Sequence, residues 1–262
     1  MVVHVIADYG QGDLAFAEVA QRLKLHLPDA EPVLTPVPPF ATLAAGFCIA
    51  QLGLNGAPPG TLIYHNVAPR AYDEAARAGN AGERLAYALL PTGARVVGAT
   101  AGYTYAFLRD VADELRWANV PAEGSQFRSR DLFPQAAAAI ALGRPDALAG
   151  PIDPSEIPAV PRGRVAYVDG YGNLKLTITP EAHGLARGAR VRARLGDAAR
   201  EAVVSDGSFD VAPGEIAFAP GSSGWTTARG GEVRWMELFL RGGNAWEAFG
   251  RPVAGAEVDL TS

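Results

Sequence analysis

The chain has 262 residues, of which 48% are hydrophobic, so it is long enough for one large or two ordinary domains with a substantial core. Its net charge is −5 and its lysines and arginines form no cluster, which argues against nucleic acid and against an anionic membrane as partners. No apolar run reaches the roughly 18 residues needed to span a bilayer. The first residues carry no basic leader, and the single cysteine, Cys48, allows no disulfide framework, so a cytoplasmic location is expected.

The first 150 residues alternate between expected strands and helices. The apolar run Val2–Ala7 predicts a buried strand that feeds a polar loop, and Asp13 can cap the helix that follows. Further strands are expected at 32–39, 61–67, 84–90 and 94–98, and helices at 40–52, 105–117 and 131–142. The segment 70–83 is interpreted as a loop or a short exposed helix. This alternation predicts a layered α/β domain over residues 1–150.

The character of the chain changes after residue 150. Four prolines between residues 151 and 163 predict a stiff linker. Residues 164–262 then contain short β-rich runs separated by glycine, serine and aspartate. The predicted fold class is therefore α/β, with a layered α/β N-terminal domain followed by a smaller, all-β, barrel-like C-terminal domain. Ligands favour the seam between two such domains.

The most distinctive stretch opens the second domain. Two β-rich runs, Val165–Val168 and Leu174–Thr179, flank a Gly-Tyr-Gly-Asn turn and predict a hairpin, the second run alternating apolar and polar residues as a half-buried strand does. The turn combines a carboxylate (Asp169), a ring (Tyr171) and an amide (Asn173). An amide can donate to and accept from one heterocycle edge while a ring stacks on its face, so the turn can hold a purine. The alternative is an ordinary hairpin whose polar residues make only turn hydrogen bonds.

A second candidate lies at the end of the first expected strand. The segment Gly10–Ala15 matches the dinucleotide fingerprint G-x-G-x-x-A. However, Asp8 would oppose a pyrophosphate, and no acidic residue ends the second strand to take a ribose. A carboxylate at the carboxyl end of a strand suits a ribose diol, so Asp8 favours a nucleoside over NAD. The alternative role of Asp8 is a loop cap.

A third group of candidates lies in two polar stretches of the first domain. In the segment 127–131, Ser129 and Asp131 are capping residues or, together with Arg128 and Arg130, part of an anion site. The four histidines match no metal-ligand spacing, so no metal site is expected. Of these histidines only His65, near the end of a strand, is a candidate for function, with a partly buried structural histidine as the alternative.

These motifs together resemble those of the S-adenosylmethionine hydroxide adenosyltransferases and the related fluorinases and chlorinases. The likeness is spread over nearly the whole length, and the most specific match is Asp169-Gly-Tyr-Gly-Asn173 for the family's D-x-F-G-N. The other matching segments are Ile6–Asp13 for T-D-F-G-x-x-D, Pro38–Phe40 and Pro58–Thr61 for the proline-bearing second segment, Phe127–Asp131 for F-H-G-R-D, and Gly214-Glu215, Ser222–Gly224 and Glu237 through Gly243-Asn244-Ala245 for the C-terminal signature.

The resemblance implies a homotrimer that binds S-adenosylmethionine, a small nucleoside substrate, between subunits. By motif position it implies that Asp8 holds the ribose. Asn173 and the backbone of Asn244 and Ala245 would hold the adenine, and Tyr171 would stack on it. It makes Asp13, Asp169 and Ser223 candidates for the methionine end. No cofactor is implied beyond S-adenosylmethionine itself, as substrate or ligand.

The implied reaction is an in-line attack on the ribose 5′ carbon that expels methionine and, with water, gives adenosine and L-methionine. The family's Asp, Arg and His set is altered here: Ala68 stands at the Asp position and Arg128 at the His position, while Arg84 matches the Arg. Neither alanine nor a guanidinium accepts a proton, so the usual route to hydroxide is interrupted, and His65 is the candidate replacement.

Two alternatives to hydrolysis follow from these substitutions. The first is a non-catalytic homologue that binds S-adenosylmethionine or adenosine without turnover. The second is a halide-using 5′-halo-adenosine synthase, because a halide needs donors in a dry pocket rather than a base, and Ser129 matches the serine in the fluorinases' F-Y-S-R-D.

Overall fold

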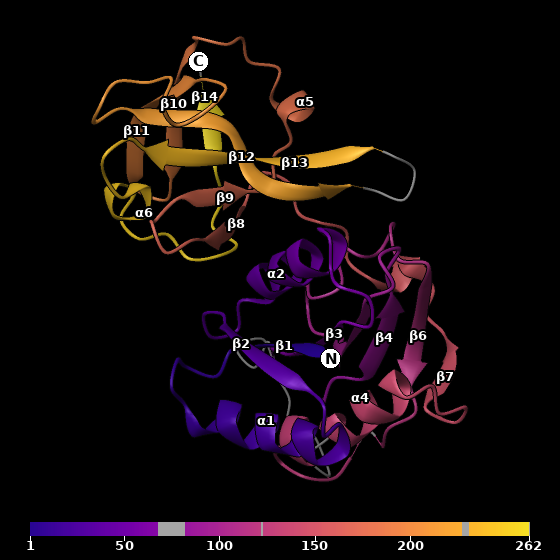
Figure 1. Cartoon of the computed structure of the whole chain (residues 1–262). Coiled ribbons are helices and arrows are strands. Elements are labelled where there is room, and N and C mark those ends of the chain that lie inside the picture. The colour runs from indigo at the N-terminus through magenta and orange to yellow at the C-terminus, as the bar shows by residue number, and fades with distance from the viewer. Residues whose placement is uncertain (68–81, 122, 227–230, 262) are drawn as a thin grey trace. The chain divides into compact units, whose positions relative to one another are not determined.

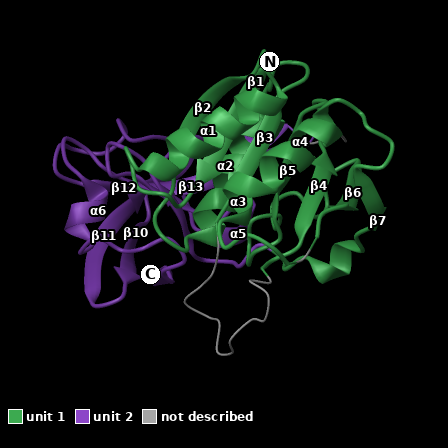
Figure 2. Cartoon of the chain, turned by 90° about the horizontal axis from the view of Figure 1, so that it is seen from below, with its two compact units in different colours: residues 1–159 green, residues 160–262 purple. Residues whose placement is uncertain are grey.

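The computed structural model describes residues 1–67, 82–121, 123–226 and 231–261, and the chain divides into two compact units, 1–159 and 160–262 (Figure 2). The division falls inside the expected proline-rich linker. Residues 151–159 belong to unit 1, where a 3-10 turn (Pro154–Glu156) is flanked by the buried side chains of Ile152 and Ile157. Asp153 caps this turn by accepting from the Ser155 N–H at 2.8 Å.

Unit 1 is built on a seven-stranded sheet with helices on both faces (Figure 1). The strand order is β2-β1-β3-β5-β4-β6-β7. The first four strands of that order run parallel, and the remaining three join antiparallel. The strands are β1 (Val2–Ala7), β2 (Glu31–Pro36), β3 (Leu62–Asn66), β4 (Leu85–Leu89), β5 (Arg95–Ala99), β6 (Glu114–Ala118) and β7 (Leu148–Pro151).

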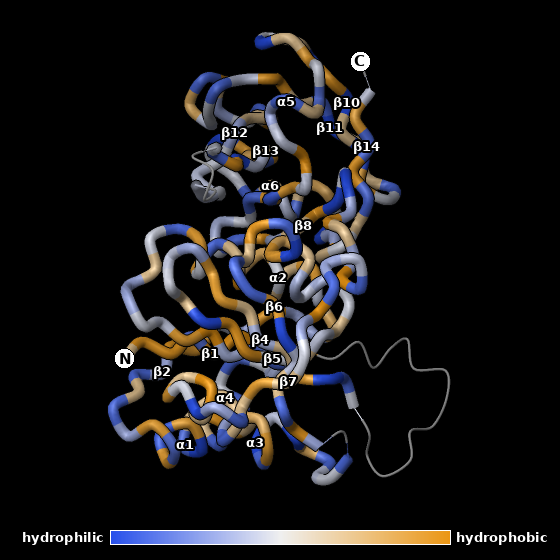
Figure 3. The backbone as a smooth tube through the Cα atoms, turned by 90° about the vertical axis from the view of Figure 1, so that its right-hand side faces the viewer, coloured by the Kyte–Doolittle hydropathy of each residue, from blue (hydrophilic) through white to orange (hydrophobic). Residues whose placement is uncertain are grey.

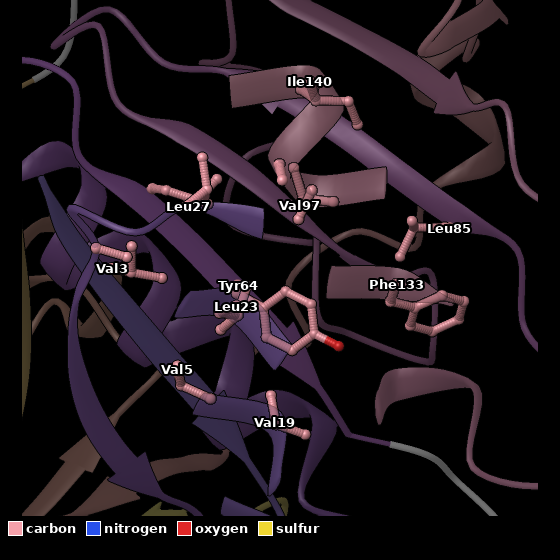
Figure 4. Packing of buried hydrophobic residues seen from close by; sticks show 14 of the residues in the cluster. Val3, Val5, Val19, Leu23, Leu27, Tyr64, Leu85, Val97, Phe133 and Ile140 are labelled. Carbon is pink, nitrogen blue, oxygen red and sulfur yellow. The ribbon is translucent and has the colours of Figure 1, made fainter. Parts of the chain in front are cut away.

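Helices α1 (Leu14–His26) and α4 (Phe133–Ala141) cover one face of this sheet. Helix α1 begins where Asp13 accepts from the Ala15 N–H at 2.7 Å, and it buries Phe16, Val19 and Leu23 at helical spacing. Figure 3 shows the resulting alternation of hydrophobic and hydrophilic residues along α1. These side chains pack with strand residues such as Tyr64 into one core (Figure 4). None of the described helices is long and apolar enough to cross a membrane.

Helix α2 (Thr42–Leu54) lies on the opposite face and is buried on nearly every side. Its outer side is covered by a series of turns at 102–111, where the Phe107 ring meets Phe47 edge-on at 5.9 Å. The backbone of Tyr103 comes so close that a Cβ on Gly46 would lie 2.3 Å from its carbonyl oxygen. A helix that is apolar all round needs such a second cover.

The expected helix at 105–117 is therefore wrong. Only its first half follows helical hydrogen bonding, since the Arg109 and Ala112 N–H groups donate to residues four positions earlier. Its second half is strand β6, which pairs antiparallel with β4. The apolar residues at helical spacing were real, but the backbone pairing that β4 offers overrides local propensity. Similarly, α4 starts at Phe133 rather than Asp131, because Asp131 ends the short helix α3 (Arg128–Asp131).

Unit 2 is an all-β, barrel-like domain built on a second seven-stranded sheet, which confirms the predicted fold class. Its strand order is β14-β10-β11-β12-β13-β9-β8, and every neighbouring pair is antiparallel except β11 and β12. The elements are β8 (Val165–Val168), β9 (Leu174–Leu176), α5 (Pro180–His183), β10 (Arg190–Leu195), β11 (Ala198–Val204), β12 (Ile216–Thr226), β13 (Glu232–Leu240), α6 (Ala245–Ala248) and β14 (Asp259–Thr261).

Candidate functional site

The Asp169–Asn173 turn joins β8 and β9, which pair antiparallel as the hairpin prediction requires. The carboxylate of Asp169 organises the turn. Its Oδ1 accepts from the backbone N–H groups of Tyr171 and Asn173, both at 3.0 Å, and its Oδ2 accepts from the Asn173 side-chain amide at 3.0 Å. Tyr171 is 82% exposed. Asp169 therefore makes the turn hydrogen bonds and holds the Asn173 amide, while the Tyr171 side chain is left exposed.

The charge state of Asp169 follows from these contacts. Burial of the carboxylate acts to raise its pKa, but the hydrogen bonds from Asn173 and Tyr171 and the nearby charge of Lys175 outweigh burial. The pKa of Asp169 is consequently lowered, and the carboxylate is an ionised acceptor at neutral pH.

The turn is joined to the segment that begins at Asn244. The Trp246 N–H donates to the Gly172 carbonyl at 2.8 Å, and Asn244 caps α6 by accepting from the Glu247 N–H at 2.9 Å. Gly172 has φ +81°, and a Cβ at this position would lie 2.1 Å from Asn244 Oδ1. The Asn244 side chain thus fills the space that a side chain on residue 172 would need. Ala245 is fully buried behind this contact.

A buried charge network lies directly beneath the turn. The Lys175 ammonium contacts Glu237 Oε1 at 3.0 Å and Oε2 at 2.9 Å, and it lies 3.4 Å from Asp169 Oδ2. Ser223 donates its hydroxyl to Glu237 Oε1 at 3.1 Å. The Lys175 side chain is 10% exposed and the Glu237 side chain 1%. The methionine-end candidate Ser223 is thus part of a network under the turn.

Sequence reasoning missed Lys175 as part of this site. Alternation in a half-buried strand assigns it to the polar face, yet all three residues of β9 are buried. One signal was present: Glu237 stands within the apolar run Trp235–Phe239, and a carboxylate in such a run needs a buried partner. Gly221 makes room for it, since a Cβ there would lie 1.8 Å from Glu237 Oε1.

In unit 1, Asp8 follows the carboxyl end of β1. Its Oδ2 accepts from the Phe40 N–H at 3.1 Å, and its own N–H donates to the Asn66 carbonyl at 3.4 Å. Phe40 has φ +61°, a left-handed conformation that is costly for a bulky residue, and the contact with Asp8 helps to hold it. Asp13 acts as the N-cap of α1. Both carboxylates therefore make structural hydrogen bonds in the loops for which ligand contacts were predicted.

Ser129 is buried in α3 between two tyrosines that the sequence did not single out. The Tyr9 hydroxyl donates to Ser129 Oγ at 2.6 Å, and the Tyr64 hydroxyl donates to the Ser129 carbonyl at 2.5 Å. Burial, with a smaller contribution from Tyr9, raises the pKa of Tyr64 well above its ordinary value. Since Tyr9 occupies an acceptor position of Ser129 Oγ, the serine can direct its own hydrogen to another group.

Arg128 and Arg84 are held by different contacts. Arg128 is buried and donates to the carbonyls of Glu83 at 3.1 Å and Pro121 at 2.8 Å, with its guanidinium 4.9 Å from the Phe133 ring centroid. Burial lowers the pKa of Arg128, against the opposing charge of Glu83. The Arg84 guanidinium lies 3.5 Å from the Trp117 ring centroid, in a cation–π contact.

His65 is enclosed in the core of unit 1. Its ring meets Tyr105 edge-on at 5.1 Å, and a Cβ on Gly98 would lie 2.3 Å from it. Among the described residues, neither ring nitrogen has a hydrogen-bond partner. Burial lowers the pKa of His65 to about 3, so the ring is neutral at physiological pH. Its burial argues against proton exchange with a ligand. Ala68, at the family's Asp position, lies outside the described residues.

Neither a family model nor a curated protein matches this chain. Solved structures with the same fold include an uncharacterized conserved protein from Thermotoga maritima, with 21% identity and a TM-score of 0.74 over 99% of this chain and 100% of that one. A conserved hypothetical protein from Thermus thermophilus has 23% identity and a TM-score of 0.65 over 98% of each chain. At these identities the likeness shows the fold, and it extends over both units.

Proposed function

We propose that this protein binds S-adenosylmethionine and cleaves the bond between its sulfonium sulfur and the ribose 5′ carbon, with water as nucleophile. The observation that carries this proposal is the Asp169–Asn173 turn. One N–H of the Asn173 amide is bound to Asp169, which fixes the amide plane and leaves the other N–H and the carbonyl oxygen for a ligand. The exposed Tyr171 ring lies two residues away.

The chemistry of adenine fits such an amide. Adenine presents a ring-nitrogen acceptor next to the exocyclic amino donor, and an asparagine amide satisfies both at once. A neighbouring aromatic ring can stack on the purine face and supply apolar contact. The segment at Asn244 and Ala245, which contacts the turn through Gly172, would then contact the same ligand.

The cleavage step is balanced without a cofactor. Water attacks the 5′ carbon as the carbon–sulfur bond breaks, the bonding electrons leave with sulfur as the neutral thioether of methionine, and the attacking water releases one proton to solvent. The protein must mainly orient one water molecule in line with the carbon–sulfur bond. Asp8 is the candidate for the ribose hydroxyls, and Ser129, whose Oγ accepts from the Tyr9 hydroxyl, is the candidate that positions the attacking water. Arg84 is the remaining candidate cation from the family's set.

A non-catalytic protein that binds S-adenosylmethionine or adenosine is the second candidate. It is favoured by His65, whose ring is buried and neutral, and by Arg128, whose guanidinium is bound to main-chain carbonyls. Neither group is suited to accept a proton from water. Use of a halide is the third candidate, since it removes the need for a base while retaining the Ser129 hydroxyl.

One experiment separates these candidates. The protein is titrated calorimetrically with S-adenosylmethionine and adenosine, and products are then separated chromatographically after incubation in ¹⁸O-labelled water, with and without chloride or fluoride. Hydrolysis predicts equal amounts of methionine and adenosine labelled at the 5′ oxygen. Halo-adenosine that appears only with halide would favour the synthase, and binding without products would favour the non-catalytic protein. Failure to bind either compound would contradict the whole proposal.

The quaternary structure is part of the same proposal. We expect a homotrimer, as the resemblance implies, and light scattering should give a mass of about three times the 27.4 kDa of one chain. A monomer mass at working concentrations would contradict the binding site between subunits that the resemblance implies.

A further inference from the structure

Burying the charges of Lys175 and Glu237 costs desolvation free energy that an apolar pair at the same two positions would not cost. The two residues face each other across the β9–β13 ladder, and the next pair in that register, Leu174 and Leu238, is apolar and fully buried. Desolvating an ammonium and a carboxylate is expensive, and an apolar pair of similar volume is often as stable or more so. The ion pair therefore calls for an explanation beyond holding two strands together.

Lys175 makes a charged contact with the Asp169 carboxylate of the turn, which an apolar residue could not make. Its ammonium is fixed by both oxygens of Glu237, and Glu237 is fixed in turn by the Ser223 hydroxyl. The ammonium also lies 3.4 Å from Asp169 Oδ2, the oxygen that accepts from the Asn173 amide. A continuous series of polar contacts thus runs from the core of unit 2 to the amide at the turn.

We propose that Lys175 and Glu237 are positioning residues that fix which edge the Asn173 amide presents, and that they thereby make the turn selective for adenine over hypoxanthine. This inference rests on the proposed function. The Lys175 ammonium, 3.4 Å from Asp169 Oδ2, anchors that carboxylate beneath the turn, and because a carboxylate only accepts, the amide must point its nitrogen at Asp169. A flipped amide would place its carbonyl oxygen against that carboxylate, where the two acceptors repel.

Orientation of the amide determines which base is bound. Adenine has an amino donor at C6 beside an acceptor at N1. Hypoxanthine has a carbonyl acceptor at C6 beside an N–H donor at N1, which is the reversed pattern. An amide with one fixed orientation matches one of these patterns and leaves unpaired polar groups with the other, whereas an amide that can flip accepts both.

The test removes both charges together. The double variant Lys175→Met/Glu237→Gln leaves neither charge buried alone, and the glutamine carbonyl can still accept from Ser223. The matched control is Arg194→Met/Asp259→Asn, a cross-strand ion pair of the same unit at 2.6 Å whose side chains are more than half exposed. Two quantities are measured for each protein. One is hydrogen–deuterium exchange of peptides covering 169–173 in the ligand-free protein, and the other is the ratio of dissociation constants for inosine and adenosine.

The expected result is specific to the double variant. Exchange at 169–173 rises about tenfold while strands β10–β12 keep their protection, and the preference for adenosine falls about tenfold, equivalent to about 1.4 kcal/mol. The control changes neither quantity. Unchanged exchange at the turn, faster exchange throughout unit 2, or an unchanged nucleoside preference would each overturn the inference. If the unmodified protein binds neither nucleoside, the proposed function fails, and exchange alone decides whether the pair orders the turn.

Discussion

Replacing Gly172 with alanine should separate the Asp169–Asn173 turn from the segment at Asn244. The backbone at residue 172 has φ +81°, and the left-handed region costs an L-residue roughly 1–2 kcal/mol. The new Cβ would also lie 2.1 Å from Asn244 Oδ1, so that side chain must leave its place. Asn244 then loses its capping hydrogen bond to the Glu247 N–H, which is worth about 1 kcal/mol. The expected loss of unfolding free energy is about 2–3 kcal/mol.

Urea unfolding followed by tryptophan fluorescence measures this loss, because Trp225, Trp235 and Trp246 all lie in unit 2. The matched control is Gly170→Ala in the same turn, where a Cβ meets nothing within 4 Å and φ is not in the left-handed region. That variant should unfold like the original protein. If Gly172→Ala cost no more than Gly170→Ala, the close packing of Asn244 on the turn would be refuted, and with it the connection between the two segments.

Three further outcomes are expected. Asn173→Ala should weaken adenosine binding by about 1–3 kcal/mol in calorimetry, because a buried partner is left unpaired, and unchanged affinity would leave Asn173 as a turn former alone. His65 is neutral when folded but takes up a proton when unfolded, so stability falls as pH drops below about 6.5. His65 should account for about 2 kcal/mol of the loss between about pH 7 and about pH 5 in urea unfolding, and the loss should be smaller by that amount in His65→Leu; a variant with the same pH dependence would contradict the assignment. Burial raises the pKa of Cys48 to about 12, so a thiolate-specific reagent at mildly alkaline pH should label it only after denaturation, and rapid labelling of the folded protein would show that the thiol is accessible.

Much of the fold could be predicted because local pattern and tertiary packing agree. Phe16, Val19 and Leu23 recur at helical spacing, and α1 buries that stripe against the sheet. The hairpin around Asp169 was predictable because its turn residues and flanking β-branched runs point to the same structure. In such segments the short-range preference of the chain and its burial in the core do not compete.

The wrong predictions fall in segments whose structure depends on strand pairing with distant parts of the chain. Phe107, Val111 and Leu115 recur at helical spacing, but the backbone groups of residues 114–118 pair with β4, and residues 114–118 alone do not indicate that partner. Lys175 was missed for a related reason. Alternation assigns a lysine to solvent, and only the register that places Glu237 opposite it shows that the charge is buried and compensated.

The proposed cleavage places a chemical demand on unit 1. Arg128, at the position of the family's His, is bound to carbonyls, and His65, the candidate replacement, is enclosed in the core, so neither is suited to accept a proton from water. A sulfonium leaves as neutral methionine without being protonated, and the water gives up its proton only as the carbon–oxygen bond forms. Cleavage therefore tolerates a missing base better than it tolerates poor orientation. That requirement directs attention to Ser129, whose Oγ accepts a hydrogen bond from the Tyr9 hydroxyl at 2.6 Å.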